Sequence, residues 1–316
     1  MISVAIPCYK SSKILRNVVE EIESFFESHS DQFDYQIILV NDGSPDEGKT
    51  SRVIRELCSE NSRILGIELS RNYGQSHAKL AALPFVNGDI LVYMDDDGQH
   101  NPYDILKLIE AIEDGNDVAI ACFNKKKHSL FKQIASDLNS HILQLAIHKP
   151  RTLVTSSFVA YSRFMIDRLA EYNSPFVSVL GYTLLHTSRI TNVPLEHRRR
   201  IDGKSGYTLR KMFNLFIDGV VGFSTFPLHL LYVVSAFLLL ISLIGIVATV
   251  VLICCNLDAA TLLLLSGIAF VGGILSMGQA ILGEYIGRIS MIQNKMPLYD
   301  IRYTWNCSNQ TGETPL

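Results

Sequence analysis

The hydrophobic positions of the first hundred residues follow two alternating spacings. Short continuous apolar runs predict buried strands, and between them apolar residues recur at the helical spacing of three and four. The predicted strands are 2–6, 35–40, 64–69 and 89–94, and the predicted helices are 13–28, 50–61 and 76–86. This order predicts an α/β domain with a mostly parallel sheet that helices cover on both faces.

Polar motifs follow three of these predicted strands. They are Pro7-Cys8-Tyr9, Asn41-Asp42-Gly43 and Asp95-Asp96-Asp97. Ligands of such sheets bind at the carboxyl ends of the strands. The pattern therefore predicts a functional site at this edge.

Two long apolar runs follow the α/β segment. The run 228–255 has 28 residues with His229 as its one ionisable side chain, and the run 259–283 has 25 residues with none. Each exceeds the roughly 20 residues that cross a bilayer core, so we expect a hairpin of two transmembrane helices rather than two buried helices of a soluble domain. Arginine and lysine flank both outer ends, while the connection 256–258 has neither. The positive-inside rule then predicts a cytoplasmic α/β domain and cytoplasmic termini.

The segment before the hairpin has apolar residues at helical spacing beside Arg210 and Lys211. It is either a surface helix or, as we favour, a helix in the membrane interface. The expected division is a catalytic domain 1–208, a juxtamembrane helix 209–226, a transmembrane hairpin 227–287 and a tail 288–316. Glycines in the second membrane helix offer a surface through which a homo-oligomer could form.

Composition narrows the function. A net charge of −3 and a pI near 6.3 argue against a nucleic-acid-binding protein. The six cysteines include no C-x-x-C pair, which favours reduced thiols over a zinc or redox site. We also find no signal-peptide pattern before the first predicted strand, which agrees with a cytosolic domain.

The acidic triplet predicts a metal site. Adjacent carboxylates repel one another unless a cation compensates, and Mg²⁺ or Mn²⁺ binds carboxylates together with substrate phosphates. In an extended segment Asp95 and Asp97 point the same way while Asp96 faces elsewhere. An acidic triplet is often a solvated loop, but its position at a strand end favours the metal site.

Several motifs resemble those of family 2 glycosyltransferases with the GT-A fold, in the family's order. They are Ile6-Pro7-Cys8-Tyr9, Val40-Asn41-Asp42-Gly43-Ser44, Ser70-Arg71-Asn72-Tyr73-Gly74 and Asp95-Asp96-Asp97-Gly98-Gln99. The segment Arg200-Ile201-Asp202-Gly203-Lys204-Ser205-Gly206-Tyr207 is similar to the R-x-x-G-x-S-x-Y of the polyprenyl-phosphate branch, which includes dolichyl-phosphate mannose synthase and undecaprenyl-phosphate sugar transferases. The resemblance covers roughly residues 2–303.

The resemblance implies a role for each matching position. The implied catalytic residues are Asp95, Asp97 and Arg200, and the implied metal ligands are Asp95, Asp97 and Gln99. The implied donor contacts are Pro7, Tyr9, Asp42, Arg71, Asp96, Lys204 and Ser205. The implied contacts to an acceptor phosphate are Lys126, Lys132, Ser136, Ser157 and Tyr207.

The chain departs from the branch at two places. Phe123 stands where an arginine is expected, and Lys126 and Lys132 offer point charges instead of guanidinium forks. Ser157 replaces the carboxylate that is sometimes proposed as a base. A phosphate acceptor is already largely ionised at pH 7 and attacks without losing a proton, so the loss leaves the reaction possible.

These patterns predict inverting transfer of one sugar from a nucleotide-diphosphate donor, with a UDP-sugar favoured, to undecaprenyl or dolichyl phosphate. The first alternative is a family 2 enzyme that extends a glycan or modifies another acceptor. The second is a membrane scaffold that binds nucleotide sugars without catalysis. Loss of transfer on replacing Asp97 would separate an enzyme from a scaffold.

Overall fold

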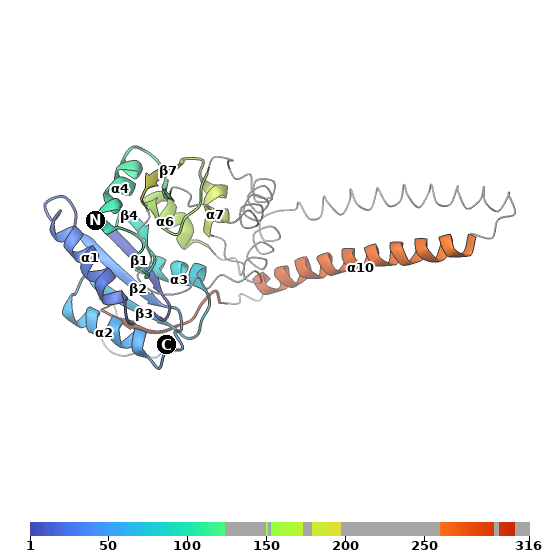
Figure 1. Ribbon diagram of the computed structural model, residues 1–316, viewed down its shortest axis with the longest axis horizontal. Helices are drawn as coiled ribbons and strands as arrows, with labels where there is room; N and C mark the ends of the chain where they lie inside the picture. The colour runs from blue at the N-terminus through green and yellow to red at the C-terminus, as the bar shows by residue number, and fades with distance from the viewer. Residues whose placement is uncertain (124–149, 151–152, 173–178, 197–259, 294–296, 307–316) are drawn as a thin grey trace.

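The computed structural model describes residues 1–123, 150, 153–172, 179–196, 260–293 and 297–306 (Figure 1). The strands are β1 (Ile2–Cys8), β2 (Tyr35–Asn41), β3 (Ile64–Leu69), β4 (Ile90–Tyr93), β5 (Val118–Phe123), β6 (Val159–Ser162), β7 (Ile190–Leu195) and β8 (Ile301–Trp305). The helices are α1 (Leu15–Glu27), α2 (Lys49–Glu60), α3 (Gln75–Ala82), α4 (Ile105–Glu113), α6 (Arg163–Ala170), α7 (Val179–His186) and α10 (Ala260–Gln293), with 3-10 turns η1 (Leu83–Phe85) and η2 (Pro102–Asp104).

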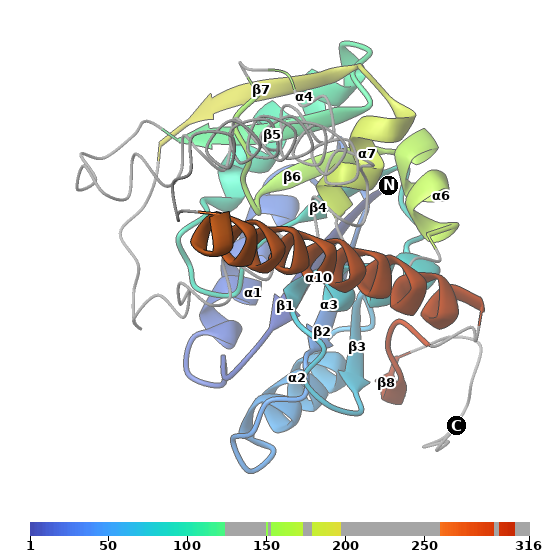
Figure 2. The same cartoon turned by 90° about the vertical axis from the view of Figure 1, so that its right-hand side faces the viewer.

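Within these ranges the eight strands form one sheet in the order β7-β5-β6-β4-β1-β2-β3-β8 (Figure 2). Strand β1 pairs in parallel with β2 and β4, and β2 pairs in parallel with β3. The predicted parallel core is therefore confirmed. Antiparallel pairs join β6 to β4 and β5, and β8 to β3, and the sequence pattern did not predict these additions.

Helices cover both faces of the central strands. Every residue of β1 and β2 is buried, because alternate side chains enter two separate apolar layers. One layer holds α1, α2 and α4, and the other holds α3 and α6. The continuous apolar strands are thus explained by burial on both sides.

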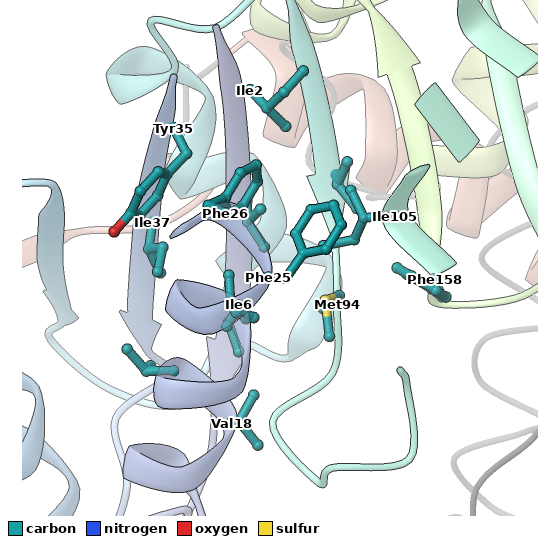
Figure 3. Packing of buried hydrophobic residues seen from close by; sticks show 14 of the residues in the cluster. Ile2, Ile6, Val18, Phe25, Phe26, Tyr35, Ile37, Met94, Ile105 and Phe158 are labelled. Atoms are coloured by element: carbon teal, nitrogen blue, oxygen red, sulfur yellow. The ribbon is translucent and has the colours of Figure 1, made fainter. Parts of the chain in front are cut away.

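Helix α1 shows how the sequence produces this packing. Its buried residues Leu15, Val18, Val19, Ile22, Phe25 and Phe26 have the spacing of one helical face. Phe25 and Phe26 reach the strand layer in Figure 3. Replacing a buried phenylalanine by alanine costs about 3–5 kcal/mol, so this face alone contributes much of the domain's stability.

Helix α10 extends away from the α/β domain (Figure 1). Large apolar side chains of this helix are exposed: Leu264, Ile268, Leu275, Met277, Ile286 and Ile289 each have a relative exposure of 60–65%. Within the described ranges, no helix is long and apolar enough to cross a membrane. The predicted juxtamembrane helix 209–226 and the apolar run 228–255 lie outside the described residues.

The C-terminal region differs from the expected simple tail after residue 287. Helix α10 continues to Gln293, and Ile301–Trp305 joins the sheet as β8. The strand was not predicted because a five-residue segment takes its conformation from the edge to which it pairs. The chain after the long helix therefore returns to the α/β domain.

Candidate active site at the carboxyl edge of the sheet

The loops that carry the predicted motifs meet because their strands run parallel in close register. Cys8 of β1 lies opposite Asn41 of β2, and Ala5 of β1 lies opposite Tyr93 of β4. The amide of Asp42 donates to the carbonyl of Cys8 at 3.0 Å. The three polar motifs therefore share one edge of the sheet, as the sequence predicted.

Asp96 ties the first of these loops to the acidic triplet. Its Oδ2 accepts a hydrogen bond from the amide of Tyr9 at 3.0 Å and another from the hydroxyl of Ser11. Burial raises the pKa of Asp96, and the hydrogen bonds from Ser11 and Tyr9 oppose that rise. Asp96, predicted as a donor contact, is placed here as the residue that fixes the loop after β1.

Asp42 holds the loop after β3 through the backbone. Its Oδ1 accepts from the amide of Tyr73 at 2.7 Å, and its Oδ2 accepts from the amide of Gly74 at 2.9 Å. The side chain is only 4% exposed. Burial raises the pKa of Asp42 although both amides act to lower it. The carboxylate of Asp42 thus holds the loop after β2 against the loop after β3.

Gly43 makes this closure possible. Its φ of +55° lies in the left-handed region, and an added Cβ would stand 2.2 Å from the backbone carbon of Arg71. A residue with a side chain would therefore suffer both strain and a backbone clash. The turn after β2 depends on glycine at this position.

Asp95 is surrounded by side chains instead. Gln75 donates to its Oδ1 at 2.7 Å, and the hydroxyl of Ser157 donates to its Oδ2. The ammonium of Lys79 donates to the carbonyl of Ser157 at 3.2 Å and lies over the ring of Tyr93. Burial lowers the pKa of Lys79, while Asp95 acts to raise it.

His100 supports Asp95 from the other side. The Asp95 amide donates to Nδ1 of His100 at 3.2 Å, which leaves the proton of a neutral ring on Nε2. That Nε2 lies 4.0 Å from Oδ2 of Asp95. The ring stacks on Phe158 with centroids 4.7 Å apart. Packing therefore fixes the position of this histidine.

The donor chemistry at the end of β4 fits a hard divalent cation. Asp95 and Asp97 offer carboxylate oxygens and Gln99 an amide oxygen, the ligand type that Mg²⁺ and Mn²⁺ prefer. The amide of Gln99 donates to Oδ1 of Asp97 at 3.1 Å, which keeps these two residues together. Among the described residues no group of three or more histidine, cysteine, aspartate or glutamate side chains is arranged to hold a metal ion.

Comparison with known proteins decides the family. The profile described as "Glycosyl transferase family 2" matches residues 3–170. The chain belongs to this family. The resemblance in the motifs is thereby confirmed, and the chain is a glycosyltransferase.

Relatives of this family 2 protein match nearly its whole length. CsbB of Bacillus subtilis strain 168, a glycosyltransferase by name, is 31% identical over 96% of this chain and 91% of its own. The undecaprenyl-phosphate 4-deoxy-4-formamido-L-arabinose transferase of Klebsiella pneumoniae strain 342 is 30% identical over 95% of this chain and 92% of its own. The protein of the same name from Erwinia tasmaniensis is also 30% identical, over 95% and 93%. The likeness therefore includes the region after the α/β domain.

A solved structure supports the GT-A-like fold of this family 2 chain. It is glucosyl-3-phosphoglycerate synthase from Mycobacterium tuberculosis in complex with Mn²⁺, UDP-glucose and phosphoglyceric acid. Its TM-score is 0.51 at 17% identity, with 70% of this chain and 77% of that chain covered. At this identity the match shows the fold.

The structure brings some of the predicted site residues into contact with one another but not others. Ser157, predicted near the acceptor phosphate, contacts Asp95 directly. Pro7 is buried in β1, Tyr9 is exposed, and the guanidinium of Arg71 lies over the ring of Tyr73. The predicted residues Lys126, Lys132, Ser136, Arg200, Lys204, Ser205 and Tyr207 lie outside the described residues.

Sequence reasoning missed the polar side chains that α3 contributes to this site. Gln75 and Lys79 lie one helical turn apart, on the side of α3 that faces Asp95. Lys79 stands between buried Ala78 and Leu80, and a lysine inside an apolar stretch was the available signal. His100 was hidden because its role depends on packing against Phe158.

Proposed function

We propose that this glycosyltransferase transfers one sugar, with inversion, from a nucleotide-diphosphate donor to a polyprenyl phosphate at a membrane surface. A UDP-sugar is the favoured donor. The observation that carries the proposal is the match, over 95% of the chain, to transferases named for undecaprenyl phosphate. Such full-length similarity includes the C-terminal part as well as the nucleotide-sugar domain.

The carboxyl edge supplies what a charged donor needs. We assign Asp95, Asp97 and Gln99 to a bound Mg²⁺ or Mn²⁺, which would offset negative charge on the departing diphosphate. The structural neighbour of the same fold was crystallised with Mn²⁺ and UDP-glucose, and we extend both to this chain. The loop after β1, which Asp96 fixes in place, and the loop that Asp42 closes would then border the nucleotide.

The network around Asp95 suits an acceptor that is already ionised. Ser157 donates its hydroxyl proton to Asp95, and in that arrangement its oxygen is not poised to remove a proton. The second pKa of a phosphate monoester is near 6, so a lipid phosphate attacks as an anion at neutral pH. The missing carboxylate at residue 157 is therefore compatible with this acceptor.

Helix α10 supports a position at the bilayer. The helix extends away from the sheet (Figure 1), and its exposed side chains include isoleucine, leucine and methionine. Apolar surface of this kind is stabilised by lipid rather than by water. We propose that residues 227–287 anchor the enzyme, with its active site on the cytoplasmic face, and a homo-oligomer through the glycines of α10 stays a prediction.

The test is lipid-linked transfer by the full chain in lipid nanodiscs. Labelled nucleotide sugars are incubated with undecaprenyl phosphate, with and without chelator, and the lipid fraction is counted. We expect a labelled lipid that chelator abolishes and added Mn²⁺ or Mg²⁺ restores. Asp97→Ala should abolish the product, whereas Asp114→Ala, at an exposed position after α4, should match the wild type.

The outcomes separate the alternatives. Label in a glycan but not in the lipid would favour an enzyme that extends glycans. Nucleotide binding without transfer to any acceptor would favour the scaffold. If the folded protein bound no nucleotide sugar in the presence of Mn²⁺ or Mg²⁺, the proposal would be wrong.

A further inference from the structure

The segment after α10 pairs with β3 at the edge of the sheet, beside the loop that follows β3. Strand β8 pairs antiparallel with β3, with Trp305 opposite Gly66 and Thr304 opposite Ile67. A Cβ on Gly66 would stand 2.7 Å from the ring of Trp305, so glycine is what lets this ring pack over β3. The packing of β8 on β3 therefore depends on glycine at residue 66.

Asn306 fastens the far end of the strand. It adopts a φ of 60°, and its amide group donates to the carbonyls of Ile64 at 2.9 Å, of Asn61 at 3.2 Å and of Cys58. These carbonyls belong to the end of α2 and the start of β3. The segment 298–306, which we call the C-terminal clasp, is thus held along the middle of β3 by strand pairing and at the start of β3 by Asn306.

The near end of the clasp reaches the loop after β3. The carbonyl of Asp300 accepts from the amide of Ser70 at 2.9 Å. Its carboxylate Oδ2 accepts from the hydroxyl of Tyr73 at 2.8 Å, and that hydroxyl lies 3.0 Å from Oγ of Ser70. The amide of the same Tyr73 donates to Asp42. A continuous path of hydrogen bonds therefore runs from the clasp to the carboxylate at the end of β2.

We propose that Asp300 is a positioning residue for donor binding, acting through Tyr73 on the loop 71–74. The inference rests on the proposed function, since it assumes that this loop borders the nucleotide. It adds that the segment just after α10 sets the geometry of the donor side. Asp300 itself is exposed and lies immediately before β8.

The hydroxyl of Tyr73 needs an acceptor to keep the ring in place. Its ring is half-buried beneath the guanidinium of Arg71, and the bond to Asp300 fixes the outer end of the ring. Loss of that acceptor lets the ring turn, and the amides of Tyr73 and Gly74 then lose their alignment with Asp42. The donor side loosens while the network around Asp95 is unaffected.

The kinetic test compares variants of the full chain in nanodiscs. Asp300→Ala and Tyr73→Phe should each raise the donor KM, on the order of fivefold for one lost hydrogen bond, with kcat within about twofold. Asp300→Asn retains a carbonyl oxygen that can accept from Tyr73 and should restore most of the affinity. The double variant Tyr73→Phe with Asp300→Ala should raise the donor KM no more than either single change does, because both changes remove the same hydrogen bond.

A second measurement does not depend on catalysis. Hydrogen exchange of the amides of Tyr73 and Gly74 should be faster in Asp300→Ala than in the wild type, and Arg302→Ala, at an exposed position of the same strand, should leave it unchanged. Faster exchange without any nucleotide binding by the wild type would contradict the proposed function but keep the link from the clasp to the loop. Unchanged exchange, or an unchanged donor KM with normal wild-type activity, would overturn the inference.

Discussion

The two aspartates that follow β2 and β4 are held in opposite ways. The carboxylate of Asp42 accepts hydrogen bonds from two backbone amides, at 2.7 Å and 2.9 Å, and is almost completely buried. The carboxylate of Asp95 accepts from the side chains of Gln75 and Ser157. One carboxylate is therefore bound to the main chain and the other to groups that can rotate.

This difference indicates a division of labour at the sheet edge. Backbone amides move only if the loop moves, so Asp42 stabilises a fixed wall. Side chains exchange partners through rotamer changes on a fast timescale, so Asp95 can release its present donors to bind an incoming ligand. The comparison is testable because changes at the wall should act on stability, and changes at Asp95 should act on turnover.

The largest expected effect is on turnover, from Asp95→Ala. Removing a group that stabilises charge in the transition state costs about 10²–10³-fold in kcat, and we expect a loss in that range or beyond. The measurement is the initial rate of lipid-linked transfer at saturating donor. The melting temperature should change little, and a large fall in it would remove the proposed distinction from Asp42.

Gly43→Ala should have the largest effect on stability. The added Cβ would clash with the backbone of Arg71 and strain a left-handed turn, so we expect a loss of about 2–4 kcal/mol by analogy with overpacked and strained sites. Denaturant unfolding of the α/β domain measures it. Gly48→Ala is the matched control, because Gly48 also has a positive φ but no neighbour within 4 Å of an added Cβ.

Asp42→Asn should have a smaller effect on stability. One amide N–H would face the asparagine NH₂ instead of an oxygen, which costs about 1–3 kcal/mol. Because burial raises the pKa of Asp42, the folded protein binds this proton more tightly than the unfolded chain. The advantage of the wild type over the variant should therefore be greatest below the ordinary carboxyl pKa and decrease as the pH rises through the raised value.

The smallest expected effect is that of Gln75→Ala on stability. Gln75 is exposed and its bond to Asp95 is an exchangeable one, so the free energy of unfolding should change by less than about 0.5 kcal/mol. Chemical denaturation of the variant beside the wild type provides the check. If Gln75→Ala lowered the free energy of unfolding as much as Asp42→Asn does, the hydrogen bonds of Asp95 would also stabilise the fold.

The sequence predicted the parallel core well because two-sided burial leaves a plain pattern. The strand 64–69 was predicted with the bounds that it has, and β1 and β2 extend only slightly beyond their predicted ends. These features depend on local periodicity.

The remaining features depend on contacts between distant segments. Strands β6 and β8 are short, and their pairing with β4 and β3 is set by the sheet and not by their own composition. The lysine of α3 became part of the site only because Ser157 and Asp95 lie beside it. The spacing of residues along the chain does not predict such a contact between distant segments.

Strand β8 has a consequence for the order of events during synthesis. Its partner β3 leaves the ribosome more than two hundred residues earlier, and until β8 arrives that edge offers unpaired amides and carbonyls to any other extended chain. Chains interrupted within or just after α10 would keep this edge open. They should therefore self-associate through β3. A peptide that binds unpaired strand edges should bind these interrupted chains but not the completed protein.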